Sequence, residues 1–364
     1  MRLLLHILTA LGFAGATLAV EEPVRVGAIR WDAWYGETGP VENVEHTLGQ
    51  PKYHFRLPWF ARVEDGIAVD INGDSEAIMR AELNYADSAG LDYWAFLDYG
   101  PGSPMTRALD RYLAADDKRG LSYCFIEEGK QIDSRGASDW ARVIGHFKSP
   151  HYLKVLDGRP LLYIFEQPKK HGREIFDELR RLTVAAGMKE PYLVLMGWNA
   201  GEHRTAFGFD AISEYACAGT GYTNDPESYE QLTSHHVKEK LWDKWALERT
   251  PCITFATAGW DTRPRQERPP PWVTWVEATP DLTPPAQQKP LRDDATATPD
   301  QIAQHLREAV VWTKTHRDLN PTQCIIIYGW NENDEGGWLI PTLGANGEPD
   351  DSRIQALGSV LGPR

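Results

Sequence analysis

The chain has 364 residues and a formal net charge of −14, with 42% hydrophobic and 25% charged residues. This is the composition of a globular protein with enough apolar material for a core. The negative charge excludes a broad electrostatic attraction to nucleic acid or to an anionic membrane surface, so we expect neither as a partner.

The N-terminal segment has the layout of a secretory signal peptide. Arg2 is followed by a mostly apolar run at residues 3–18 that ends in small residues. A spanning helix needs about 20 apolar residues, and this run is shorter. We therefore expect a signal peptide at residues 1–20, export to the periplasm or the exterior, and a single domain at residues 21–364.

The rest of the chain alternates short apolar segments with longer amphipathic ones. Near-continuous apolar runs are typical of parallel strands buried on both faces. The predicted strands are residues 24–29, 91–97, 121–126, 160–165, 192–196, 211–215, 252–255 and 324–328. The predicted helices are residues 76–89, 105–118, 138–147, 173–186, 226–248, 299–316 and 351–357. Eight strands with interposed helices and no glycine-rich nucleotide-binding turn predict a (β/α)8 TIM barrel with long loops on its C-terminal face.

A proline-rich stretch between Trp260 and Asp300 interrupts this alternation. It follows the seventh predicted strand, so in a barrel it rises from the C-terminal face. Loops of this length are usually functional or disordered. Trp272 and Trp275 favour an ordered wall beside a binding site, and a solvated linker is the alternative.

Four cysteines lie in or beside predicted strands: Cys124, Cys217, Cys252 and Cys324. Their spacing is not that of a zinc site, and we interpret them as buried free thiols. In an exported protein disulfides are the alternative.

The segment after the last predicted strand carries the strongest chemical signal. Glu332 and Glu335 are three residues apart and are followed by Gly336 and Gly337. In a helical or turn-like backbone this spacing brings two side chains to one side. Paired carboxylates are what glycoside hydrolysis requires, one as general acid and the other as base or nucleophile. An acidic surface turn without a special role is the alternative.

The residues around these glutamates resemble a known signature. Trp330-Asn331-Glu332-x-x-Glu335-Gly336 is similar to the W-N-E-x-x-E-G motif of glycoside hydrolase family 99, the endo-α-mannosidases and endo-α-mannanases, and of the related WbsX-like proteins. The resemblance extends over most of the chain. It includes residues 28–36, which end in Trp-Tyr-Gly, and residues 86–94, 147–160 and 259–263, the last of which resembles a G-W-D-x-x-x-R element.

The resemblance implies roles for both glutamates. Glu332 would act as the base on a sugar 2-hydroxyl, giving a 1,2-anhydro intermediate and net retention. Glu335 would be the general acid and then the base that activates water. Two departures bear on specificity. Asn333 and Asp334 replace the family's Trp and His, which puts Asp334 near the site, and residues 339–341 replace a downstream glutamate.

Further candidates for substrate binding lie at or beyond predicted strand ends, where aromatic faces can stack on sugar rings and polar groups can bind hydroxyls. The aromatic candidates are Trp31, Trp34, Tyr35, Trp94, Tyr99, Trp198, Tyr215, Trp260 and Trp330. The polar candidates are Asp32, Asp98, Glu166, Glu214, Asp261, Arg263, Asn331 and Asp334. We expect Arg263 to bind a negatively charged sugar substituent and Asp261 to hold it in place.

The sequence thus predicts an exported glycoside hydrolase that acts on a poly- or oligosaccharide, without a cofactor and without a metal. A WbsX-like enzyme of polysaccharide biosynthesis and a non-catalytic glycan-binding protein are the alternatives. The sugar, the linkage and the oligomeric state stay open.

Overall fold

The computed structural model describes residues 22–35, 40–66, 68–197, 199–221, 225–274, 293–344 and 346–362. The parallel strands of the central sheet are β1 (Arg25–Arg30), β4 (Tyr93–Leu97), β5 (Ser122–Glu128), β7 (Arg159–Phe165), β8 (Tyr192–Met196), β9 (Ala211–Ser213), β10 (Thr254–Thr257) and β11 (Cys324–Tyr328). They pair in the order β10-β11-β1-β4-β5-β7-β8-β9, and β6 (Lys154–Val155) adds antiparallel to β7.

The sheet closes on itself between β9 and the segment entering β10. Ile212 pairs with Cys252 in parallel, and the Ile253 amide donates to the Ile212 carbonyl at 2.8 Å. The fold is therefore the expected (β/α)8 barrel, and all eight predicted strands are present.

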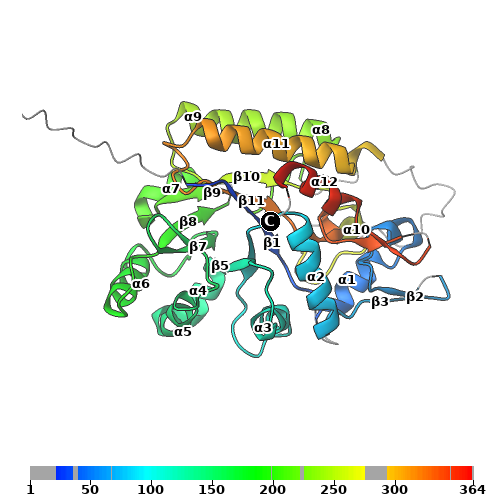
Figure 1. Ribbon diagram of the computed structural model, residues 1–364, viewed down its shortest axis with the longest axis horizontal. Coiled ribbons are helices and arrows are strands. Elements are labelled where there is room, and N and C mark those ends of the chain that lie inside the picture. The colour runs from blue at the N-terminus through cyan, green and yellow to red at the C-terminus, as the bar shows by residue number, and fades with distance from the viewer. Residues whose placement is uncertain are drawn as a thin grey trace, which may run out of the picture.

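Helices surround this barrel (Figure 1). They are α2 (Glu76–Ser88), α3 (Arg107–Ala114), α4 (Gly129–Arg135), α5 (Trp140–Phe147), α6 (Glu174–Ala185), α7 (Ala200–Phe207), α11 (Pro299–Thr315) and α12 (Ser352–Leu361). Between β9 and β10, α8 (Tyr229–Gln231), the π-helix η4 (Leu232–Asp243) and α9 (Lys244–Leu247) follow one another directly. This helical segment lies beside α11 (Figure 1), and Lys238 pairs with Glu308 across the two at 2.8 Å.

Local sequence explains where several helices begin. Ser75 caps α2 by accepting from the Ala77 amide at 3.2 Å. Thr298 and Gln301 form a capping box at the start of α11. The helix predicted at residues 299–316 corresponds to α11, which ends at Thr315, one residue before the predicted end.

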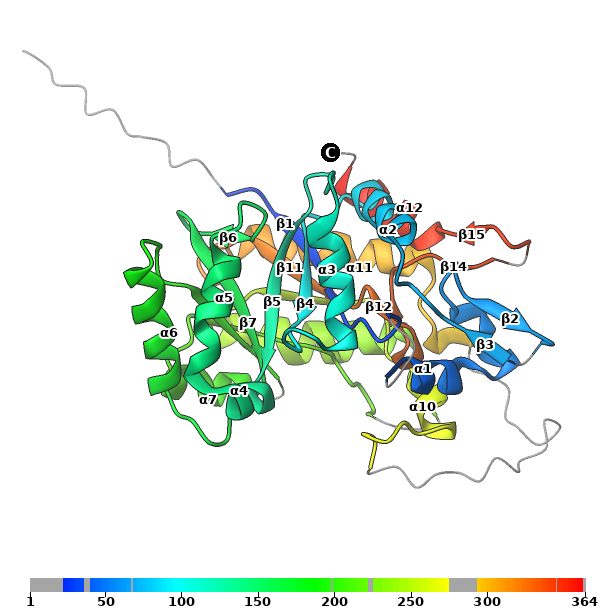
Figure 2. The ribbon, with the colours of Figure 1, turned by 90° about the horizontal axis from the view of Figure 1, so that it is seen from below.

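Shorter elements stand on the C-terminal side of the barrel or flank it. They are α1 (Pro40–Leu48), η1 (Pro51–Arg56), β2 (Arg62–Glu64), β3 (Ala68–Asp70), η2 (Pro104–Thr106), η3 (Gly136–Asp139), α10 (Arg263–Glu267), η6 (Asp293–Ala295), β12 (Asn331–Glu332), η7 (Asn333–Glu335), β13 (Gly337–Trp338), β14 (Thr342–Leu343) and β15 (Pro349–Asp350). Figure 2 shows α1, α10 and β12 gathered at one end of the strands, and α1 and α10 both contact η7. This is where the candidate site lies.

The four cysteines are buried and unpaired, as interpreted from the sequence. In the part of the chain that the structure describes, the helices lack the length and apolarity that crossing a bilayer requires.

Close packing inside the barrel makes one position in β1 intolerant of a side chain. The Tyr93 hydroxyl lies 3.0 Å from that of Tyr163 and donates to the Ile325 carbonyl at 2.9 Å, which fixes its ring across the interior. A Cβ added at Gly27 would lie 2.4 Å from this ring.

We therefore predict that Gly27→Ala lowers the free energy of unfolding by about 1–3 kcal/mol, the usual cost of overpacking a filled core. Urea unfolding followed by circular dichroism measures it. Gly145→Ala is the matched control, because nothing lies within 4 Å of its added Cβ in α5. There the change should be stabilising by up to about 1 kcal/mol through helix propensity. Equal effects of the two substitutions would contradict the packing argument.

Candidate active site

The turn that follows β11 folds back on itself and brings its two glutamates together. Asn331 pairs with Trp338 and Glu332 with Gly337, so β12 and β13 form a tight hairpin around η7. Gly336 has a φ of +87°, a left-handed conformation that favours glycine. The backbone between the glutamates is therefore turn-like, the condition under which their three-residue spacing brings both side chains to one side.

Both glutamates are buried and both contact the same guanidinium. Glu332 and Glu335 are 2% and 6% exposed. Arg265 places Nη2 at 3.6 Å from Glu332 Oε2, and its Nη1 donates to Glu335 Oε1. The two carboxylates therefore converge on one cation.

A tyrosine hydroxyl binds the second oxygen of each glutamate. Tyr215, two residues beyond β9, donates to Glu332 Oε1 at 2.6 Å. Tyr328, the last residue of β11, donates to Glu335 Oε2. Burial and the neighbouring carboxylates raise the pKa of both tyrosines well above its ordinary value, so both hydroxyls keep their protons. Every oxygen of the glutamate pair has a protein partner.

The environment of Glu332 favours its protonated form. Burial raises the pKa of Glu332 well above its ordinary value, and the negative charge of Glu335 raises it further. Arg265 and the Tyr215 hydroxyl act in the opposite direction. Mutual repulsion between close carboxylates is a common way to hold one proton on a pair.

Arg265 is itself fixed by the third acidic residue of the turn. It donates through Nε to Asp334 Oδ2 at 2.7 Å and through Nη2 to Asp334 Oδ1 at 2.9 Å. Its guanidinium lies 4.9 Å from the centre of the Trp31 ring. Arg265 and Asp334 are almost fully buried, with 4% and 1% of their surfaces exposed.

Trp31 is held at the end of β1 by polar contacts. Its backbone amide donates to Asn331 Oδ1 at 2.9 Å, and Asn331 Nδ2 donates to Asp32 at 3.1 Å. The Trp31 indole donates to the Tyr99 hydroxyl at 2.9 Å. Trp272 packs edge-on against Trp31, with ring centres 5.9 Å apart. Trp272 of the proline-rich stretch therefore lies beside Trp31, whereas Trp275 and the rest of residues 275–292 lie outside the described residues.

Asp261 ties the loop after β10 to this turn. Its backbone amide donates to the Glu335 carbonyl at 2.7 Å. Arg263 donates to its carboxylate through Nε at 2.7 Å and through Nη2 at 2.6 Å, and Arg56 pairs with the same carboxylate. Burial alone would raise the pKa of Asp261, but Arg56 and Arg263 lower it to about 2.

Two glycines allow these loops to touch. A Cβ at Gly336 would lie 2.4 Å from the Asp261 amide nitrogen, and a Cβ at Gly259 would lie 2.4 Å from the Gly336 carbonyl oxygen. Gly259 also has a left-handed φ, of +141°. The loop after β10 and the turn after β11 are therefore in direct backbone contact.

Comparison with known proteins assigns the chain to a family. Residues 128–348, more than half of the chain, match the family described as Glycosyltransferase WbsX. The chain belongs to this WbsX family. A comparison with curated proteins gives no match.

Solved structures show the same fold as this WbsX family member. A protein described as glycoside hydrolase-like is similar with a TM-score of 0.59 and 13% identity, over 94% of this chain and 95% of that one. The family 99 endo-α-mannosidase from Bacteroides thetaiotaomicron is similar with a TM-score of 0.55 and 14% identity, over 93% of this chain and 96% of that one. The same enzyme in complex with bis-tris-propane gives a TM-score of 0.52 at 15% identity.

Four of the aromatic residues predicted to bind substrate lie elsewhere in this WbsX chain. Trp34, Tyr35, Trp94 and Trp330 are all at most 1% exposed. Because side chains alternate along a strand, Trp94 points away from the barrel interior that Tyr93 fills. It packs against Tyr112 of α3, with ring centres 6.2 Å apart. Proximity to a strand end was not sufficient to place these side chains at the mouth.

Tyr35, Trp94 and Trp330 surround a buried ion pair on the outer side of β1, and the Arg30 guanidinium lies 4.3 Å from the centre of the Trp94 ring. Arg30 pairs with Asp32 at 2.8 Å and with Glu82 of α2. The Tyr35 hydroxyl and the Trp330 indole donate to Glu82 at 3.0 and 3.1 Å. Asp32 is therefore a structural partner of Arg30 and Asn331, and we assign it no contact with substrate.

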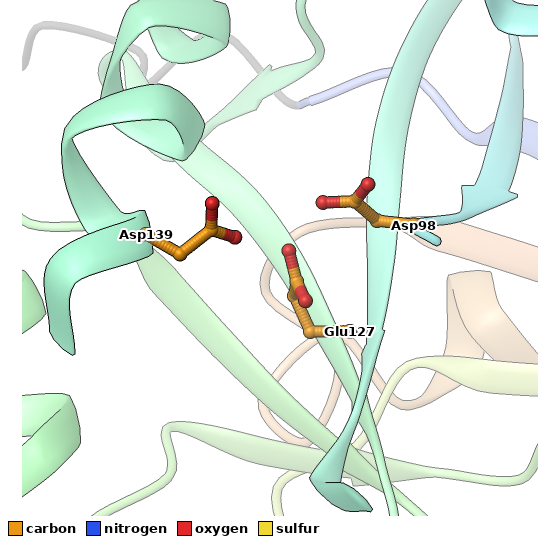
Figure 3. Close-up of side chains that lie close together, drawn as sticks. All are labelled: Asp98, Glu127 and Asp139. Atoms are coloured by element: carbon orange, nitrogen blue, oxygen red, sulfur yellow. The ribbon is translucent and has the colours of Figure 1, made fainter. Parts of the chain in front are cut away.

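Asp98 belongs to a second charged cluster, at the ends of β4 and β5 (Figure 3). Oxygens of Asp98, Glu127 and Asp139 lie within 4.8 Å of one another. Arg135 donates to Glu127 at 3.0 Å and to Asp139 at 2.9 Å, and Arg142 pairs with Asp98 and with Asp139. These arginines already compensate the carboxylates, so Asp98 is held in an ion-pair network instead of facing substrate.

The remaining residues predicted to bind substrate differ in burial and in their contacts. Trp260 is 7% exposed, donates to the Gly221 carbonyl at 3.1 Å and lies 5.8 Å from the Tyr328 ring. Glu166 is exposed at the end of β7. Burial raises the pKa of Glu214 to about 8, against the opposing charge of Lys244 on α9. Trp198 lies outside the described residues.

Sequence reasoning missed Arg265, although the signal was present. The G-W-D-x-x-x-R element has three residues between its Asp and its Arg, and counting from Asp261 reaches Arg265, not Arg263. Arg263 forms the expected pair with Asp261, to which it donates through Nε and Nη2. Tyr328 was missed because it was counted only as a strand residue.

The Asp98 cluster makes a pH-dependent contribution to stability. Burial and the charge of Asp98 raise the pKa of Glu127 well above its ordinary value of 4.5. For Asp98, burial opposes the hydrogen bond from Glu127 and the charge of Arg142, which together lower its pKa. The folded protein thus binds the Glu127 proton more tightly than the unfolded chain. The stabilisation that this tighter proton binding gives is complete below about pH 4.5. It is lost as the pH rises through the folded-state pKa of Glu127.

We predict that Glu127→Gln removes this loss, because an amide can donate to Asp98 at any pH and still accept from Arg135. The gain in unfolding free energy over wild type should be larger at pH 8 than at pH 5, by about 1 kcal/mol or more. Urea unfolding at both pH values measures it, with the surface variant Glu178→Gln as control. A gain that is the same at both pH values would argue against a shared proton.

Proposed function

We propose that the protein is a glycoside hydrolase that cleaves a glycosidic bond in a poly- or oligosaccharide with Glu332 and Glu335. The observation that carries this proposal is the convergence of both carboxylates on Arg265 beyond the ends of the barrel strands. The fold shared with the family 99 endo-α-mannosidase supports it. Active sites of this fold lie at the same face of the barrel.

The proposed first step requires that the single proton of the glutamate pair lies on Glu335. Ionised Glu332 then removes the proton of the sugar 2-hydroxyl. The 2-oxygen attacks the anomeric carbon, the bond to the leaving oxygen breaks, and Glu335 gives its proton to that oxygen. Arg265 and the Tyr215 hydroxyl lower the pKa of Glu332 and so favour the ionised form that this step requires, against burial and the charge of Glu335, which raise that pKa. Once ionised, a glutamate with a raised pKa is a stronger base than an ordinary one.

In the second step Glu335 takes a proton from water, whose oxygen attacks the anomeric carbon. The bond from that carbon to the 2-oxygen breaks, and Glu332 returns its proton to the 2-oxygen. Two inversions give net retention, and no bond forms between sugar and protein. The residues that this mechanism uses are supplied by the chain, so no cofactor is proposed.

The family description favours one alternative, the transfer of a sugar in polysaccharide biosynthesis. Such donors usually carry phosphate groups, which bind best to uncompensated cations and helix N-termini. In the candidate site three carboxylates surround the single guanidinium of Arg265. This charge balance disfavours a nucleotide-sugar donor and supports hydrolysis of an uncharged glycan.

We predict that Glu332→Gln and Glu335→Gln each lower the rate of glycan hydrolysis by at least about a hundredfold, the usual contribution of a general acid or base. Both variants should stay folded. The assay is release of reducing ends from plant, fungal and bacterial glycans, including α-mannans. Glu178→Gln, on the exposed face of α6, is the control.

Two outcomes would contradict this proposal. One is wild-type turnover in either variant. The other is wild-type protein that leaves every glycan intact but consumes a nucleotide sugar in the presence of an acceptor, which favours the biosynthetic alternative. NMR of the first-formed anomer tests retention on any substrate that is cleaved.

We also propose that the protein is exported, on the basis of the N-terminal sequence alone. Residues 1–21 lie outside the described residues, and the domain begins its first barrel strand at Arg25. Expression with the native N-terminus should give a mature protein that starts near residue 21 in the periplasmic or extracellular fraction. Edman or mass-spectrometric analysis of the N-terminus measures it. Retention of Met1 on a cytosolic protein would reject export.

A further inference from the structure

Asp334 lies between the two glutamates in sequence and is oriented by contacts of its own. Both of its oxygens accept from Arg265, at 2.7 and 2.9 Å. The Thr47 hydroxyl, from α1, donates to Asp334 Oδ2 at 3.2 Å. A two-point fork between guanidinium and carboxylate fixes the plane of both groups. Asp334 therefore determines the position and orientation of the Arg265 guanidinium.

That position gives Arg265 contact with both glutamates at once. The fork occupies Nε and one N–H of Nη2, while Nη1 donates to Glu335 and Nη2 also lies near Glu332. The Trp31 ring lies 4.9 Å from the guanidinium and limits its movement on that side. Because α10 has only five residues, the fork and the ring contact supply much of the restraint on this side chain.

Arg265 and Asp334 act on the glutamates with opposite electrostatic signs. Arg265 lowers the pKa of Glu332, whereas Asp334 raises it. The other ionisable groups that face the pair are Tyr215, Tyr328 and Tyr99, and burial raises the pKa of each tyrosine well above its ordinary value. Besides Glu335, Arg265 and Asp334 are thus the two charged neighbours that shift the pKa of Glu332, and they shift it in opposite directions.

We propose that the Asp334–Arg265 fork is the positioning element of the site, which holds the two glutamates on one guanidinium and sets the pH range in which one of them is protonated. This inference rests on the proposed function. It assigns a role to Asp334, which stands where the resembling family 99 motif has histidine. Neither residue transfers a proton in the reaction. Arg265 and Asp334 act through Glu332 and Glu335.

Three substitutions separate charge from geometry. Arg265→Gln removes the cation, so both limbs of the pH profile of kcat/KM should move to higher pH, by about 1 unit. Asp334→Asn removes an anion and should move both limbs to lower pH. Arg265→Lys keeps the charge but loses the fork, so the limbs should stay within about half a unit of wild type while kcat falls roughly 10- to 100-fold.

Arg181→Gln is the matched control, since Arg181 is an exposed arginine on α6 that pairs with Glu178 of the same helix. It should leave the pH profile and kcat unchanged. A purely structural role for Arg265 and Asp334 would lower activity in both charge variants without moving the limbs in opposite directions. That result, or shifts of the same sign, would overturn the proposal.

A second readout does not depend on catalysis. In protein carrying glutamate labelled with carbon-13 at the side-chain carboxyl, the two site signals are assigned by comparison with Glu332→Gln and Glu335→Gln. The opposite pKa shifts in Arg265→Gln and Asp334→Asn should appear in their NMR titrations. If these shifts are present and no glycan is cleaved, the positioning role holds and the proposed hydrolase function fails. If the wild-type protein cleaves glycans but the two variants show no such shifts, the positioning role fails and the proposed hydrolase function stands.

Discussion

The buried guanidinium of Arg265 is the interaction on which the candidate site depends. It contacts Glu332, Asp334 and Glu335, three acidic residues within four positions of the chain. Without a cation, carboxylates at this depth would repel one another and bind protons instead. The two tyrosine hydroxyls complete the arrangement by satisfying the oxygens that Arg265 does not reach. The site is therefore preorganised, and its geometry follows from pairing charges that cannot be exposed to water.

Two further ion-pair networks support this centre from either side. On the outer side of β1, Arg30 bridges Asp32 and Glu82, and through Asn331 this network reaches the turn that carries the glutamates. On the other side, Arg56 and Arg263 share Asp261. Breaking a buried pair leaves an uncompensated charge, which typically costs several kcal/mol, so these networks fix the hairpin firmly.

The sequence was sufficient for the fold and for the prediction that Glu332 and Glu335 lie close together. Apolar runs such as residues 324–328 are typical of strands buried on both faces, and eight of them alternating with helices favoured a closed barrel. The glutamate spacing predicted two side chains on one side of a turn. Local sequence could not say which way a residue near a strand end points, because one step in register reverses the face. Trp94 was misplaced for that reason. The G-W-D-x-x-x-R element marks Arg265, but the contacts of Arg265 with the glutamates span some 70 positions of chain, and the element does not reveal them.

The close backbone contact between Gly259 and Gly336 couples the position of the loop after β10 to that of the turn after β11. Their backbones lie so close that a methyl group on either glycine has no room. The loop after β10 and the turn after β11 therefore cannot be lengthened, swapped or redesigned one at a time. A change in the first would displace the carbonyl of the second and with it the carboxylate of Glu335. In divergence within the family, as in engineering for a new sugar, these two segments must be exchanged together.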